Sequence, residues 1–194
     1  MIFSNGRHEN KPDFSARQIA SAGVLTAMTV VTTVFTKIPV SIVQGYFNLG
    51  DTIILVAGVL SGGITGAFTG AAGSAIADIL TGNYIFAPIS LIVKGLEGYV
   101  AGKLANSTAT SRGRPKRRRL MLALIVSACV MVAGYFIAES TVLLLFDRAF
   151  GVTAAVAELP FNLAQGGISV VLARLAIEGL KRSKIIQFET QKYL

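Results

Sequence analysis

The sequence predicts an all-α integral membrane protein whose single domain is a bundle of six transmembrane helices. Of its 194 residues, 53% are hydrophobic and only 14% are charged, whereas soluble domains carry roughly 25% charged residues. Long stretches lack any charged residue and are continuously apolar rather than alternating, which favours helices over the strands of a barrel. The five uncharged stretches are 18–36, 52–77, 79–93, 120–138 and 159–173.

The six helices are placed by these stretches and by glycine and proline breaks. The first follows a polar tail and is too long, with too poor a cleavage site, to be a removable signal peptide. The second is short and joins the third through a tight turn at 61–63. We expect helices at 16–36, 48–61, 64–80, 84–104, 120–146 and 154–181. Together they form a membrane domain of 16–181, which includes a basic cytoplasmic loop at about 105–119. Cytoplasmic tails at 1–15 and 182–194 flank this domain.

The distribution of basic residues predicts how the bundle is oriented. Six helices place both termini, the turn at 61–63 and the loop at 105–119 on one side, which then holds 15 of the 18 Lys and Arg residues. Short cytoplasmic loops are enriched in Lys and Arg, so we expect both termini in the cytoplasm and the protein in the plasma membrane of a prokaryote. We interpret the basic segment 112–119 as a stop-transfer loop that touches anionic lipid, and we expect no nucleic-acid partner.

Polar side chains within the membrane domain gather between its outer surface and its midplane. Ionisable residues in a membrane normally face the interior of a bundle or a water-filled cavity. Their shared depth therefore predicts a cavity that is open to the outside. The candidate ligand-binding residues are Tyr46, Phe47, Asn48, Tyr84, Lys94, Glu97, Tyr135, Glu139, Asn162 and Gln165.

Several polar residues have a second interpretation that the sequence leaves open. Lys94 and Glu97, three positions apart on one helix, either neutralise each other or contact the ligand. Asn162 and Gln165 share a helix face and serve either the ligand or a neighbouring helix. We expect Asp51 at the outer surface, where a carboxylate keeps its water or caps the start of the second helix.

Small residues at four-residue spacing predict where helices approach each other closely. The third helix carries Gly62, Gly66, Gly70 and Ser74 at this spacing, which indicates an internal packing face. The first helix carries small residues in the same pattern. That face either packs internally or receives a helix of another subunit; it includes Ala16, Ala20, Gly23 and Ala27.

The chain carries no constellation for catalysis, metal binding or ATP hydrolysis. Its one histidine, His8, lies in the polar tail, and no zinc spacing, Gly-x-Ser-x-Gly motif or Walker motif occurs. We therefore expect a protein that is not an enzyme and that holds neither a cofactor nor a metal. Any step driven by ATP must come from a partner.

Five motifs follow one another along the membrane domain. They are Gly-Tyr-Phe-Asn-Leu-Gly-Asp (45–51), Ala-Asp (77–78), Lys-Gly-Leu-Glu-Gly (94–98), Gly-Tyr-Phe-x-x-Glu (134–139) and Glu-Leu-Pro-Phe-Asn-Leu-x-Gln-Gly (158–166). In this order they resemble the S components of energy-coupling factor (ECF) vitamin transporters. The resemblance covers about 16–181 and is closest to the branch of riboflavin, hydroxymethylpyrimidine and pyridoxine-type proteins.

The resemblance implies an outward-facing vitamin site under the loop between the first two helices, with Tyr46, Phe47 and Asn48 at the edge of the gate. It also implies three partners, a membrane coupling subunit and two cytoplasmic ATPases, and a subunit that tilts in the bilayer to release its cargo. Small residues on the first helix contact the coupling subunit in this family. That makes Ala16, Ala20, Gly23 and Ala27 the candidate partner interface, although Val24 departs from the usual alanine spacing.

These observations favour a subunit that captures a vitamin or vitamin precursor from outside the cell for ATP-driven uptake by its partners. The alternative is a stand-alone proton-coupled transporter of a small polar metabolite, in which Lys94, Glu97 and Glu139 relay protons. A membrane enzyme is a third hypothesis, and it lacks a catalytic pair. The motifs do not specify which vitamin is bound.

Overall fold

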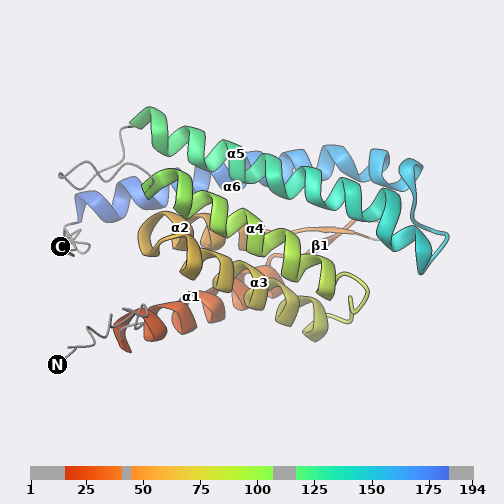
Figure 1. The fold of residues 1–194 in the computed structure, drawn as a ribbon, viewed down its shortest axis with the longest axis horizontal. Coiled ribbons are helices and arrows are strands. Elements are labelled where there is room, and N and C mark those ends of the chain that lie inside the picture. Colours follow the sequence, from red (N-terminus) through yellow and green to blue (C-terminus); the bar gives the residue numbers. More distant parts are fainter. Residues whose placement is uncertain (1–15, 41–44, 107–116, 184–194) are drawn as a thin grey trace, which may run out of the picture.

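The computed structural model describes residues 16–40, 45–106 and 117–183, and they form the predicted bundle of six helices (Figure 1). Two short strands, β1 (Ile38–Pro39) and β2 (Tyr46–Phe47), pair antiparallel between the first two helices. The predicted tail at 1–15, residues 107–116 of the basic loop and the tail from 184 onwards lie outside the described residues, as does 41–44. The helices are α1 (Ala16–Phe35), α2 (Gly50–Ser61), α3 (Gly63–Leu80), α4 (Ala87–Asn106), α5 (Arg117–Ile137) and α6 (Val152–Arg182).

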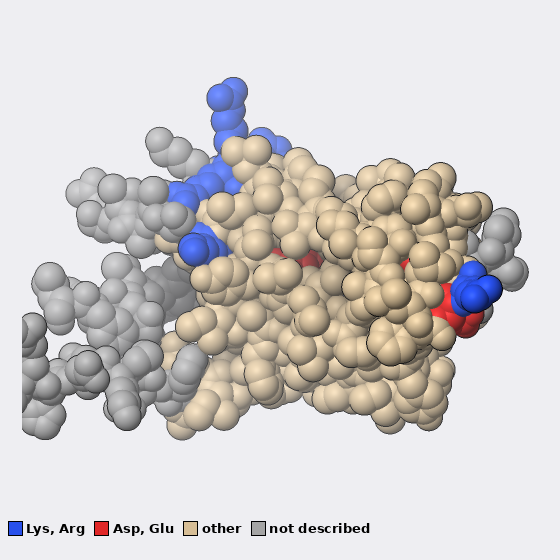
Figure 2. Space-filling model, turned by 45° about the vertical axis from the view of Figure 1, so that its right-hand side comes forward, with Lys and Arg blue, Asp and Glu red and all other residues tan. Residues whose placement is uncertain are grey.

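Length and composition suit four of these helices to crossing a membrane: α1, α3, α5 with its continuation, and α6. Helix α2 is shorter, and α4 is long enough but carries Lys94, Glu97 and Lys103. The start of α1 and the end of α6 lie at the same end of the bundle, as an even number of spans requires (Figure 1). Charged side chains gather at the two ends, and the face between them is almost wholly uncharged (Figure 2). The protein is an integral membrane protein.

Helix α2 lies at the centre of the bundle and contacts the five other helices, α5 least. Eight of its twelve residues are buried, as expected of a helix that is apolar around most of its circumference. Asp51 occupies its first turn. The central position of α2 therefore carries this carboxylate into the interior.

Glycines allow α2, α3 and α4 to approach each other closely. A Cβ atom added at Gly66 on α3 would lie 2.6 Å from the Cα of Gly58 on α2 and 2.5 Å from the carbonyl oxygen of Gly98 on α4. Such distances leave no room for a side chain, which confirms the predicted packing face of the third helix. Gly62 makes the turn between α2 and α3 at a positive φ of 92°, where glycine is strongly favoured.

Two irregular helical segments lie in the outer half of the bundle, the half away from the chain termini. The sequence predicts one helix to residue 146, but after Ile137 the chain continues as a π-helical turn, η1 (Ala138–Val142), and a 3₁₀ turn, η2 (Leu143–Leu145). Helix α6 contains Pro160, which has no backbone N–H to donate within the helix. The π-helical turn contains Glu139 and packs against α6.

Candidate functional site

A pocket lies in the outer half of the bundle, between the loop that carries β2 and the outer parts of three helices. It encloses about 310 Å³ of empty space, part of it open to the outside. Only about 20 Å³ of this space admits the centre of a water-sized sphere, which is room for about one water molecule, so a larger ligand requires the lining residues to move apart. The lining residues are Gly45, Tyr46 and Asn48 from the loop, Phe86 and Ser90 from the start of α4 and the turn before it, Tyr135 from α5, and Glu158, Asn162 and Gln165 from α6.

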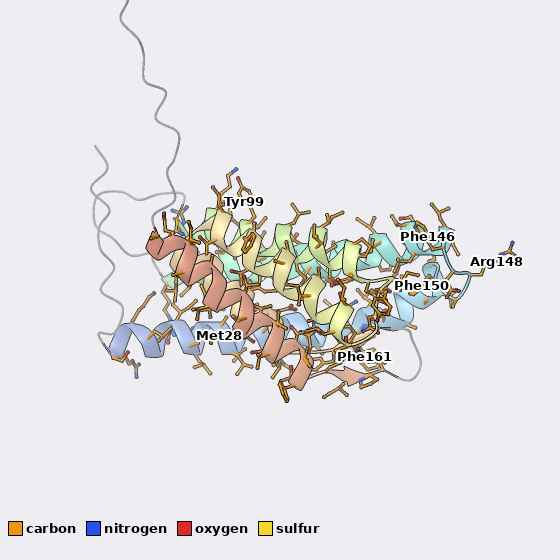
Figure 3. The ribbon with its side chains drawn as sticks, turned by 90° about the horizontal axis from the view of Figure 1, so that it is seen from below. Met28, Tyr99, Phe146, Arg148, Phe150 and Phe161 are labelled. Atoms are coloured by element: carbon orange, nitrogen blue, oxygen red, sulfur yellow. The ribbon has the colours of Figure 1, made fainter. Side chains whose placement is uncertain are left out.

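Aromatic side chains pack at the outer end of this pocket. Phe86 is buried and meets the ring of Phe150 edge to face, with centroids 5.6 Å apart and planes at 75°. Phe150 lies near the outer tip of the molecule, where Phe146 and Arg148 project (Figure 3). The Phe86 wall is therefore supported by packing from the segment between α5 and α6.

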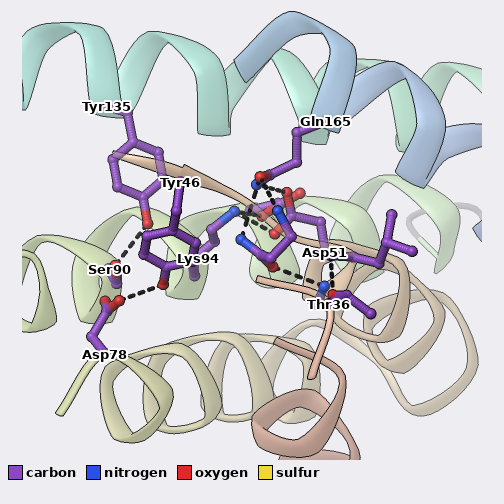
Figure 4. A network of polar contacts seen from close by, with 12 residues as sticks. Thr36, Tyr46, Asp51, Asp78, Ser90, Lys94, Tyr135 and Gln165 are labelled. Atoms are coloured by element: carbon purple, nitrogen blue, oxygen red, sulfur yellow. Dashed lines mark hydrogen bonds and ion pairs between the residues drawn. The ribbon is translucent and has the colours of Figure 1, made fainter. Parts of the chain in front are cut away.

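Asp51 lies at the base of a buried polar network (Figure 4). Its side chain is 1% exposed, forms an ion pair with Lys94 through Oδ1, and accepts a hydrogen bond of 2.8 Å from Gln165 Nε2 through Oδ2. The expectation that Asp51 keeps its water at the surface or caps α2 is wrong. The start of α2 is instead held by Asn48, whose Oδ1 accepts a hydrogen bond of 2.8 Å from the backbone N–H of Gly50.

Lys94 is neutralised within the bundle. Besides Asp51, its ammonium lies 3.7 Å from Glu97 Oε2 and 5.3 Å from the centre of the Tyr135 ring. Among the described residues Lys94 and Glu97 thus face each other, with Asp51 as the closer partner of Lys94. Neither Lys94 nor Glu97 is among the pocket-lining residues.

The edge of the loop is tied to α6 by two amide side chains. Gln165 Oε1 accepts hydrogen bonds from the backbone N–H of Asn48 at 2.8 Å and from its Nδ2 at 3.3 Å. Because the other side of the Gln165 amide donates to Asp51, each amide is already engaged within the protein. This arrangement holds Asn48 and the adjoining strand β2 at the rim of the pocket.

A second pair of contacts supports the opposite wall. Tyr46 donates its phenolic hydrogen to Asp78 Oδ1, and Ser90 Oγ lies 2.7 Å from the Tyr135 hydroxyl (Figure 4). Burial, reinforced by the charge of Asp78, raises the pKa of the Tyr46 phenol, which therefore remains a hydrogen-bond donor. Lys37 lies over the Tyr46 ring, 4.5 Å from its centre. The Tyr46 side chain is thus contacted by Asp78 at its hydroxyl group and by Lys37 at one face of its ring.

Two carboxyl groups, Glu139 from η1 and Glu158 from α6, meet at the pocket wall. Glu139 is 1% exposed, lies within reach of Glu158, and receives no hydrogen bond from a donor in the described part of the chain. The backbone at Gly45 lies against the Glu158 carboxylate, so that a Cβ atom added at Gly45 would overlap it. The carboxylate of Glu158 is therefore held between the loop and Glu139.

Asn162 differs from the other amides of the pocket. It lies one helical turn after Glu158, is 8% exposed and lines the pocket. Within the described residues its side chain makes no hydrogen bond. Its donor and acceptor atoms are therefore free to bind a molecule in the pocket.

The structure brings five of the predicted site residues together in the pocket lining and places Lys94, Glu97 and Glu139 outside it. Phe47 is half-buried in β2 and outside the lining, and Tyr84 is 68% exposed in the turn between α3 and α4. The five residues in the lining are Tyr46, Asn48, Tyr135, Asn162 and Gln165.

Four lining residues are not among the predicted ligand-binding residues: Gly45, Phe86, Ser90 and Glu158. The spacing of Glu158 and Asn162, four positions apart on one helix, placed both on the same face and was a usable signal. Phe86 and Ser90 are ordinary apolar and small residues, and nothing in their pattern indicates a ligand.

The predicted partner face of α1 is exposed along its length. Ala16, Ala20, Gly23 and Ala27 are all exposed, and a Cβ atom added at Gly23 would meet nothing within 4 Å. Helix α1 packs against α2 and α3 through other residues, among them Thr29. Internal packing therefore does not explain this small-residue face in the described part of the chain.

Comparison with known proteins finds similar sequences and a similar fold. The sequence model of the family described as ECF-type riboflavin transporter, S component, matches residues 13–182. A protein of Pyrococcus woesei, described as an uncharacterized protein in the gap 3′ region, is 34% identical over 142 residues, which are 73% of this chain and 86% of that protein. A solved structure described under "Structure and mechanism of the S component of a bacterial ECF transporter" superimposes with a TM-score of 0.68 at 18% identity. It covers 86% of this chain and 96% of its own, and the likeness shows a shared fold.

Proposed function

We propose that this chain, which belongs to the family of ECF-type riboflavin transporter S components, captures a vitamin or vitamin precursor of the riboflavin, hydroxymethylpyrimidine or pyridoxine type. The ligand binds from outside the cell in the pocket between β2 and helices α4, α5 and α6. A membrane coupling subunit and two cytoplasmic ATPases then drive its uptake. The chain acts as a binding subunit and not as an enzyme.

The observation that carries this proposal is the composition of the pocket. One apolar wall at Phe86 faces hydrogen-bonding groups from the loop and from three helices. A flat heterocycle with polar edges needs this combination, since apolar surface provides burial and a few convergent polar groups provide orientation. Dependence on partners is supported by the sequence, which contains no Walker motif, and by the exposed small-residue face of α1.

Binding by the purified chain tests the proposal directly. Mass spectrometry should find a co-purifying vitamin-like compound, and riboflavin, 4-amino-5-hydroxymethyl-2-methylpyrimidine or pyridoxine should raise the apparent Tm at one ligand per chain without ATP. Asn162→Ala should weaken this binding, because it removes the free amide of the pocket. Leu163→Ala is the matched control, because Leu163 follows it on α6 and is exposed. The proposal is refuted if none of these compounds binds.

Transport distinguishes the proposal from a proton-coupled transporter. Proteoliposomes that contain only this chain should bind the vitamin and show no uptake in response to a proton gradient. Uptake should appear when the coupling subunit, the two ATPases and ATP are added. Gradient-driven uptake by the chain alone would favour the proton-coupled alternative.

A further inference from the structure

We propose that Glu158 is the specificity-determining residue of the pocket: it accepts a hydrogen bond from a ring or amino nitrogen of a neutral or cationic heterocycle and excludes the anionic phosphate ester of the same compound. This inference rests on the proposed function. It adds the charge class of the ligand and the residue that selects it.

The first step is the distribution of charge around the pocket. None of the described residues that line it is basic; Lys94 is engaged by Asp51 and Glu97, and the half-buried Lys37 lies over the ring of Tyr46. Glu158 is the one carboxylate among the described lining residues. An anionic ligand would therefore enter a pocket whose described lining holds a carboxylate and no cation.

The second step concerns the state of the two carboxyl groups. Two carboxylates within reach of each other do not both remain charged without a proton or a cation between them. Glu139 is the more buried of the two, and burial disfavours its charged form, so a proton on Glu139 satisfies the contact. Glu139 then donates to Glu158, which keeps a negative charge and free acceptor positions.

The third step is the direction in which Glu158 and Asn162 present their polar atoms. They lie four positions apart on α6, on the same helix face, and both line the pocket. The carboxylate only accepts hydrogen bonds, whereas the neighbouring amide both donates and accepts. Together they complement a heterocycle edge on which an N–H group stands next to a carbonyl oxygen or a ring nitrogen.

The fourth step is the fixed position of the carboxylate. Gly45 lies against Glu158 on one side and Glu139 lies on the other, so Glu158 has little freedom to turn away. An acceptor held in place binds its ligand more tightly than one on a mobile side chain, because less conformational entropy is lost on binding. Glu158 is thus a preorganised acceptor.

The experiment compares neutral compounds with their phosphate esters on the purified full-length chain. The pairs are riboflavin with riboflavin 5′-phosphate and pyridoxine with pyridoxine 5′-phosphate, and dissociation constants are measured by titration calorimetry. The ester of whichever compound binds should bind at least about tenfold more weakly, from charge repulsion across several ångströms at an effective dielectric constant of about 20. This comparison needs no variant and so does not depend on the folding of a mutant.

The variant Glu158→Gln isolates the carboxylate. It should weaken binding of the neutral compound roughly 10- to 100-fold, because a hydrogen bond to a charged acceptor is lost. It should also reduce the ratio between the dissociation constants of the ester and of the neutral compound. Glu178→Gln is the control on the same helix, since Glu178 pairs with Arg174 at the far end of α6. Equal binding of compound and ester by the wild type, or unchanged preference in Glu158→Gln, overturns this inference alone. Absence of binding by every compound overturns the proposed function as well.

Discussion

Replacing Lys94 with methionine tests whether the buried polar network stabilises the bundle. The change removes one cation and leaves Asp51 and Glu97 facing each other in the interior. At 3.7 Å and an effective dielectric constant of about 20, the attraction between Lys94 and Glu97 alone amounts to about 4.5 kcal/mol. Part of this offsets the cost of burying the charges, and loss of one partner from a buried pair typically costs about 3–5 kcal/mol.

We therefore expect Lys94→Met to lower the apparent Tm by roughly 6–20 °C, taking about 2–4 °C per kcal/mol for a chain of this size. The assay is thermal denaturation of the purified chain in detergent, followed by the loss of helical circular dichroism. Lys103→Met is the matched control on the same helix. Lys103 is exposed and lies 5.3 Å from the centre of the Tyr99 ring, an interaction worth only about 0.5–1 kcal/mol.

A second substitution separates charge from packing. In Lys94→Met with Glu97→Gln, one of the two unpaired carboxylates becomes neutral, so part of the lost stability should return. The reasoning is refuted if Lys94→Met changes the apparent Tm no more than Lys103→Met does. It is also refuted if the double variant is less stable than Lys94→Met alone.

Three further changes probe other parts of the structure. Gly66→Ala should destabilise the bundle by about 1–3 kcal/mol, because its Cβ would overlap the backbone of α2 and α4. Gly167→Ala is the control and should be neutral or slightly stabilising, because a Cβ there meets nothing within 4 Å. The free energy of unfolding of the two variants is compared by chemical denaturation. Tyr46→Phe should lower the stability of the bundle by about 1–3 kcal/mol and weaken vitamin binding, because buried Asp78 loses the hydrogen bond from the Tyr46 hydroxyl. An apparent Tm and a vitamin affinity equal to those of the wild type would contradict this. Glu139→Gln should raise the apparent Tm, because the new amide donates a hydrogen bond to Glu158, whereas the carboxyl group of Glu139 must first bind a proton to do so. An apparent Tm below that of the wild type would argue against a contact between residues 139 and 158.

The sequence predicted the helices well because a membrane leaves few alternatives for an apolar chain. Backbone groups in lipid must be bonded within the chain, so long uncharged stretches specify helices almost by themselves. Glycines at four-residue spacing likewise identified the packing face of the third helix, since backbone approach requires small residues. The end of the fifth helix was predicted less well: the π-helical turn after Ile137 packs against α6, and Ser140 and Thr141 donate to the carbonyl oxygen of Ile137.

The site was predicted in part, and Asp51 shows why the prediction failed where it did. A carboxylate in the first turn of a helix is ordinarily expected at a surface, where it caps or keeps water. Its true environment depends on α2 being surrounded by the five other helices, of which α4 and α6 bring Lys94 and Gln165 to it. Those contacts join residues 43 and 114 positions apart in the chain, and no local pattern encodes them.

The buried polar groups of this bundle fall into two kinds, and the difference separates scaffold from ligand contact. Lys94, Gln165 and Asn48 have their polar atoms engaged by other protein groups, so a ligand would have to break existing bonds to use them. Glu158 and Asn162 line the same pocket with acceptor or donor capacity left over. Buried polar atoms without a hydrogen-bond partner also occur outside the pocket, at Glu97 and Ser169 for example, so unused capacity alone does not mark a ligand contact. Unused capacity together with a place in the pocket lining favours Glu158 and Asn162 for ligand recognition, and the network around Asp51 for support of the gate edge.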